Sequence, residues 1–139
     1  MKRKIQSEYS ISNIQSSMVK EGSFDLKDRL IDYAVRIIRL TEALPNTKAG
    51  AHVAGQILRS GTSPAPNYGE ALAAESQADF VHKLKVALKE LRETEIWLKI
   101  IARAKMVASA KPLAPLLTET DELSAILFTS IQTAKQRKA

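Results

Sequence analysis

The stretch Gln56-Ile-Leu-Arg-Ser-Gly-Thr-Ser-Pro-Ala-Pro-Asn-Tyr-Gly-Glu-Ala71 interrupts a chain whose residue pattern is otherwise typical of helices. A proline inside a helix removes one backbone hydrogen bond and costs about 3 kcal/mol. Apolar residues nevertheless continue at helical spacing on both sides, from Val53 and Ile57 to Leu72. We therefore expect one helix that is kinked near Pro64 and Pro66.

Short polar side chains surround the two prolines. Hydroxyl and amide groups can bond the carbonyls that a proline leaves free, and the candidates for this role are Ser60, Ser63 and Asn67. The run from Ser60 to Ser63 lacks the Gly-Lys-Ser/Thr ending of a phosphate-binding loop and follows no strand. We therefore interpret the stretch as a self-capped kink. Upstream, Ala49, Ala51 and Ala54 make this helix narrow, so a neighbour can approach closely.

Three further helices follow from apolar residues at helical spacing. They span about residues 25–44, 79–105 and 112–137, with Pro45 and Pro112 marking two of the connections. The clearest apolar face belongs to residues 79–105, and we expect Phe80, Leu84, Ala87, Leu91, Thr94, Leu98 and Ile101 to be buried. On the same helix Val86, Trp97 and Ile100 widen the apolar arc beyond what one core needs, which suggests self-association.

Length and composition favour one all-α domain. The chain has 139 residues, five glycines, five prolines and no cysteine, which excludes disulfides, thiolate metal sites and cysteine nucleophiles. No apolar run is long enough for a signal peptide or a membrane span. Residues 1–22 have no repeating apolar face and are expected to be a flexible extension. Residues 23–139 are expected to form an antiparallel up-and-down four-helix bundle.

The net charge of +6 is concentrated in part of the chain. Residues 77–105 carry seven basic side chains against four acidic ones. At 100° per residue, five of the basic ones form a stripe opposite the apolar face: Lys85, Lys89, Arg92, Lys99 and Arg103. Such clustering is typical either of a solvated surface or of phosphate binding. No aromatic residue is interleaved with the stripe, so sequence-specific reading of single strands is not expected.

The acidic residues give no indication of catalysis. Glu90 and Glu93 could act as general acid and base, but no nucleophile motif or convergent histidine accompanies them. We expect them, with Glu70, to be partly buried or interface groups that pair with bases such as Arg59, Arg36 or a lysine of a neighbouring subunit. The run from Asp79 to His82 is the only acid-x-x-His motif, too few for a di-metal bundle site. No catalytic residue, metal or cofactor is predicted.

Two ordered series of residues resemble a known family. They are Gln56-x-x-Arg59-Ser-x-x-Ser63-x-x-x-Asn67-x-x-Glu70-Ala71 and Asp79-Phe80-x-x-Lys83-Leu84-x-x-Ala87-x-Lys89-Glu90-Leu91-x-Glu93-Thr94. Over residues 23–135 the chain resembles the four-helix bundle family encoded within intervening sequences of bacterial 23S ribosomal RNA genes. It departs from the family at Ser63-Pro-Ala-Pro66, where an aliphatic-small-small run is more usual.

The resemblance implies a cytoplasmic bacterial homopentamer with an RNA-linked role and no enzymatic activity. The chain is also similar to the accessory bundle protein of diversity-generating retroelements, a basic pentamer that binds reverse transcriptase and nucleic acid. Our leading expectation is a basic, oligomeric scaffold that binds RNA, DNA or a ribonucleoprotein through the stripe. The alternative is an adaptor for a protein, such as a ribosomal protein or a reverse transcriptase.

Overall fold

The computed structural model describes residues 25–138, so the predicted extension over residues 1–22 lies outside the described residues. The described part is all-helical and contains no strand. Five helices follow in order: α2 (Leu26–Glu42), α3 (Lys48–Thr62), α4 (Pro64–Leu72), α5 (Gln77–Arg103) and α6 (Leu113–Lys138). None of these helices is long and apolar enough to span a bilayer.

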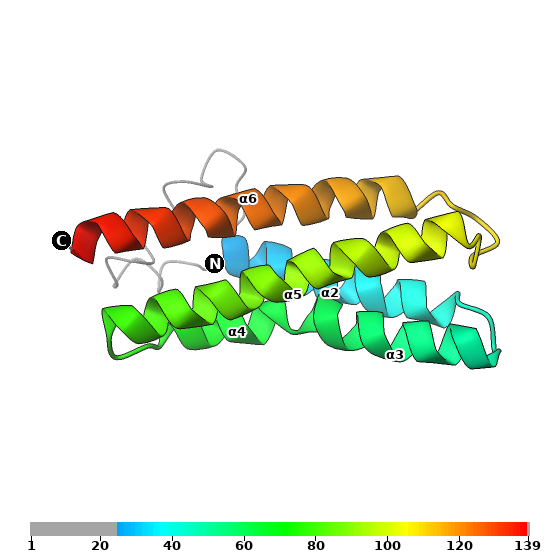
Figure 1. The fold of residues 1–139 in the computed structure, drawn as a ribbon, viewed down its shortest axis with the longest axis horizontal. Helices are drawn as coiled ribbons and strands as arrows, with labels where there is room; N and C mark the ends of the chain where they lie inside the picture. The colour runs from blue at the N-terminus through cyan, green and yellow to red at the C-terminus, as the bar shows by residue number, and fades with distance from the viewer. Residues whose placement is uncertain (1–24, 139) are drawn as a thin grey trace.

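Four arms lie side by side because α3 and α4 follow one another end to end (Figure 1). The colour gradient runs in opposite directions along successive arms. Helix α5 packs against α3, α4 and α6, while α2 packs against the same three helices from the other side. The prediction of an all-α four-helix bundle is confirmed, and the arrangement leaves α2 and α5 at opposite corners of the bundle.

The core consists of the apolar faces that helical spacing predicts. All seven residues expected to be buried on α5 are buried, and Thr94 is the one polar member of that set. Two tyrosines, Tyr33 on α2 and Tyr68 on α4, are fully buried beside the leucines and isoleucines. An ion pair of 2.8 Å between Arg29 and Glu119 joins α2 to α6 at the edge of this core.

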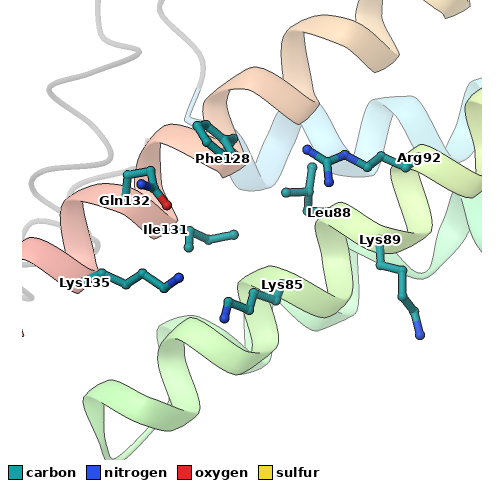
Figure 2. A pocket seen from close by; sticks show the side chains of 8 residues that line it. All are labelled: Lys85, Leu88, Lys89, Arg92, Phe128, Ile131, Gln132 and Lys135. Carbon is teal, nitrogen blue, oxygen red and sulfur yellow. The ribbon is translucent and has the colours of Figure 1, made fainter.

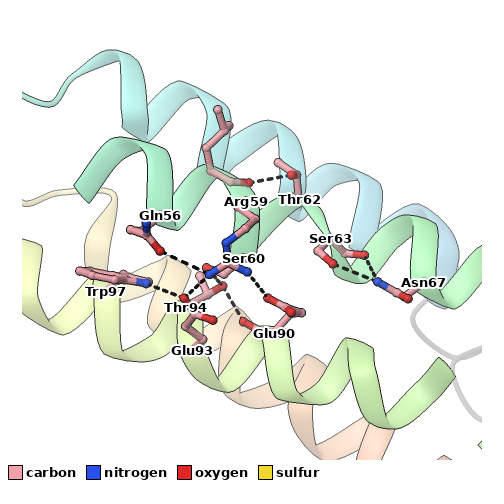
Figure 3. A network of polar contacts seen from close by, with 11 residues as sticks. Gln56, Arg59, Ser60, Thr62, Ser63, Asn67, Glu90, Glu93, Thr94 and Trp97 are labelled. Carbon is pink, nitrogen blue, oxygen red and sulfur yellow. Dashed lines mark hydrogen bonds and ion pairs between the residues drawn. The ribbon is translucent and has the colours of Figure 1, made fainter. Parts of the chain in front are cut away.

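The interruption between α3 and α4 is one residue long. Ser63 itself has helical backbone angles (φ −69°, ψ −35°), and backbone bonds continue on both sides of it. The amide of Asn67 donates to the carbonyl of Ser63 at 3.0 Å and to its hydroxyl at 2.9 Å (Figure 3). This pair involves two of the three predicted residues, but the carbonyl of Ser63 is not one that Pro64 or Pro66 leaves free.

The prediction that Ser60, Ser63 and Asn67 bond the carbonyls freed by the two prolines is wrong, and Ser60 has a different partner. Its buried hydroxyl bonds the hydroxyl of Thr94 on α5, with 2.8 Å between the oxygens, and Thr94 is also 2.8 Å from the carbonyl of Glu90. The carbonyls that Pro64 and Pro66 leave free are those of Ser60 and Thr62, four residues earlier. Among the described residues no side chain donates to either carbonyl, because Asn67 reaches Ser63 instead. Ser60 thus joins two helices of the bundle.

Candidate nucleic-acid interface

The five cations of the predicted basic stripe are all exposed on α5. They lie on the side opposite the buried face that Leu84 and Leu91 form, so folding leaves them in water. Lys99 pairs with Glu95 one turn earlier at 2.9 Å. The other four, Lys85, Lys89, Arg92 and Arg103, form no ion pair within residues 25–138. These charges are therefore not used to hold the described part of the bundle together.

A groove of about 330 Å³ lies between α5 and α6 (Figure 2). Its apolar wall comes from Leu88, Ile131 and the exposed ring of Phe128. The polar side chains that line it are Lys85, Lys89, Arg92, Gln132 and Lys135. No carboxylate lines the groove, so it combines an apolar surface with four positive charges.

The groove divides the predicted stripe. Lys85, Lys89 and Arg92 line it, whereas Lys99 and Arg103 belong to the C-terminal part of α5 and do not. Figure 2 shows the ammonium groups of Lys85 and Lys135 extending toward one another. The guanidinium of Arg92 extends toward α6, while Lys89 points away. Three cations from two helices therefore converge on the groove.

The sequence argument placed none of the α6 residues of the groove beside the stripe. Phe128 lies outside the buried face of α6, and its off-face position is a signal of exposure that periodicity could have given. Lys135 comes from α6, so a stripe defined on residues 79–105 alone could not include it. The expectation that no aromatic accompanies the stripe is corrected, because packing of α6 against α5 brings Phe128 beside it.

Glu90 and Glu93 on α5 are tied into ion pairs (Figure 3). Arg59 on α3 bonds Glu90 at 3.0 Å and also bonds Glu93, whose carboxylate accepts a 3.0 Å hydrogen bond from the indole of Trp97. Arg59 was one of the partners expected for these carboxylates. The geometry gives both acids a structural role between α3 and α5 and leaves neither facing the groove.

Glu70 on α4 pairs with Lys83 on α5 at 2.8 Å. The hydrogen bond from Lys83 and the negative charge of Glu70 together raise the pKa of the lysine. The basic partner predicted for Glu70 is therefore found within the same chain. In the described part of the molecule no three His, Asp or Glu side chains gather in a group that could hold a metal ion.

Comparisons with known proteins agree with this geometry at the level of fold. A family model described as 23S rRNA-intervening sequence protein matches residues 22–129. A solved structure from Bacteroides thetaiotaomicron VPI-5482, a protein with unknown function from the S23 ribosomal protein family, is 37% identical. The match covers 77% of this chain and 95% of that one, with a TM-score of 0.71. A search of curated proteins found no match.

Proposed function

The chain belongs to the family of 23S rRNA-intervening sequence proteins, and from this premise we propose that it is a non-enzymatic, oligomeric bundle that binds RNA or a ribonucleoprotein. The basic surface of α5 and the adjoining groove supply the contact. The single observation that carries the proposal is the set of cations at the groove, which have no ion-pair partner among the described residues. A cytoplasmic site of action, where RNA is available, belongs to the same proposal.

The electrostatics favour a polyanion. Lys85, Arg92 and Lys135 repel one another in the free protein, and a phosphate chain lowers that repulsion while releasing its own counterions. The binding constant should therefore fall steeply with salt. For a single strand that neutralises four cations, a plot of log K against log salt should have a slope of about −3.

Charge reversal tests the proposal. We expect the double variant Lys89→Glu/Arg92→Glu to bind a fluorescein-labelled 20-nucleotide RNA at least about tenfold more weakly at 50 mM salt, since each lost phosphate contact removes counterion release. Fluorescence anisotropy measures the affinity, and circular dichroism should show unchanged helicity because both side chains are exposed.

The matched control is Lys48→Glu/Lys111→Glu, which makes the same change of net charge at exposed positions away from the groove. It should bind nearly as well as the parent. An equal loss of affinity in the control would mean that RNA binding depends only on the net charge of the protein. A parent protein that does not bind RNA at low salt would overturn the proposal.

A protein-binding adaptor is the second candidate function. The observation that favours it is the exposed apolar surface on the same helix, where Ile96 and Ile100 lie next to the cations. Copurification of one protein with the chain after nuclease treatment would support the adaptor. Loss of that partner on nuclease treatment would support RNA binding.

We also propose that the oligomer is a homopentamer, as the family resemblance implies. Two separate sets of exposed apolar side chains support self-association: Ile31, Val35 and Ile38 at successive turns of α2, and Ile96 with Ile100 on α5. These sets are called the α2 patch and the α5 patch below. They lie on helices at opposite corners of the bundle.

A further inference from the structure

We propose that the groove between α5 and α6 holds a nucleotide of a single strand, with its base stacked on Phe128 and its phosphates on Lys85, Arg92 and Lys135. This inference rests on the proposed nucleic-acid binding and adds the form of nucleic acid that the groove takes. It is carried by an exposed aromatic ring, an apolar wall and converging cations in one concave site.

The ring of Phe128 is available for stacking. Phe128 is 49% exposed, although phenylalanine is among the residues most often buried, and it lines the groove beside Ile131 and Leu88. Proteins that bind single strands combine aromatic surfaces of this kind with a basic channel along the backbone. Such stacking tolerates any base, because every base has an aromatic face.

The cations lie where the backbone of a stacked nucleotide would need them. Lys85 comes from α5 and Lys135 from α6, and their ammonium groups extend toward one another across the groove. An anion between them would relieve their repulsion. Gln132 lines the same groove and carries both a donor and an acceptor, which can bond the edge of a base.

A duplex fits this arrangement less well than a single strand. In a duplex the bases are stacked on one another and paired, so none is free to lie against Phe128. A duplex could contact only the cations, through the phosphates of its backbone. The groove volume of about 330 Å³ is at the lower end of the range of small-ligand sites, consistent with one nucleotide and not with a helix.

Three fluorescein-labelled probes of 15 nucleotides test the inference: oligouridine, an abasic strand with the same phosphates, and an RNA duplex. We expect Phe128→Ala to weaken binding of oligouridine about tenfold, since one base stack is lost. The affinities for the abasic strand and the duplex should not change. Phe128→Trp should keep the affinity, and oligouridine should quench its added emission relative to the parent, which has only Trp97.

Leu58→Ala is the matched control, because it removes a similarly exposed apolar side chain from α3, away from the groove. It should leave all three affinities unchanged. If Phe128→Ala is neutral, or weakens the abasic strand equally, the stacking inference is overturned while nucleic-acid binding stands. If the parent binds none of the probes, both proposals fail.

Discussion

Tyr33 illustrates how a single buried polar group is accommodated in this core. Its hydroxyl lies 2.5 Å from that of Thr120 on α6, and Thr120 is in turn 2.7 Å from the carbonyl of Leu116. Burial disfavours the phenolate and raises the pKa of Tyr33 to about 12. Burial also raises the pKa of Tyr68. Both phenols are therefore held neutral in the folded state.

Alkaline pH should destabilise the protein through these phenols. In the unfolded chain a tyrosine ionises near pH 10, so between about pH 10 and 12 the unfolded state loses protons that Tyr33 retains when folded. The contribution of each such phenol to the free energy of unfolding is fully present below pH 10. Above pH 10 it falls by about 1.4 kcal/mol per pH unit. Urea denaturation from pH 8 to 11.5 measures this slope.

Tyr33→Phe should lose the part of that slope that Tyr33 contributes, which separates this phenol from every other group that titrates in alkaline solution. At neutral pH the variant should be only about 0.5–1.5 kcal/mol less stable, because Thr120 keeps its bond to the backbone. If absorbance at 295 nm showed Tyr33 ionising near pH 10 with helicity intact, the role of burial would be refuted.

The approach of α3 to α2 depends on one glycine. A Cβ added at Gly61 would lie 2.8 Å from both γ-carbons of Ile37, whereas one added at Gly55 would meet nothing within 4 Å. Of the alanines expected to provide the close approach, Ala49 and Ala51 are exposed and only Ala54 is half-buried. Helical spacing alone could not distinguish these small residues, because the partner helix decides which of them is covered.

Two alanine substitutions on α3 should therefore change the stability of the bundle in opposite directions. We expect Gly61→Ala to destabilise the bundle by about 1–2 kcal/mol, since overpacking against Ile37 outweighs the gain in helix propensity. Gly55→Ala should stabilise it by about 0.5–1 kcal/mol through propensity alone. Urea denaturation with an unchanged m-value measures both. Stabilisation by Gly61→Ala would show that α2 and α3 do not pack this closely.

The sequence was sufficient to predict the helices but not to predict how they pack against one another. The burial of Leu84, Leu91 and Leu98 follows from 3.6-residue periodicity within one helix. Leu88 lies off that face and is still buried, because α6 covers it. The meeting of Phe128 with the basic stripe depends on the same packing. A feature formed by two helices, such as the groove, therefore could not be predicted from the periodicity of either helix alone.

At the scale of the whole molecule, a closed pentamer places a geometric demand on the surface. A five-membered ring has heterologous interfaces, so each subunit must offer two different surfaces that fit one another. The α2 patch and the α5 patch are the candidates for these two surfaces, because they are apolar, exposed and on helices at opposite corners of the bundle. Each ring interface would join the α2 patch of one subunit to the α5 patch of the next.

Light scattering coupled to gel filtration tests this ring. We expect the parent at ten micromolar to have a mass of about 76 kDa, five times that of the 15.3 kDa chain. Val35→Glu and Ile100→Glu should each give monomers, since burying an unpaired charge in an apolar interface is costly. Leu58→Glu, outside both patches, should remain pentameric.

Mixing the two monomeric variants distinguishes a ring from a symmetric dimer contact. The Val35→Glu chain keeps an intact α5 patch and the Ile100→Glu chain an intact α2 patch, so the mixture has one working interface. It should form a one-to-one heterodimer of about 31 kDa and nothing larger, because neither chain can extend further. A mixture that stays monomeric would refute the pairing of these two patches, and a monomeric parent would refute the oligomer itself.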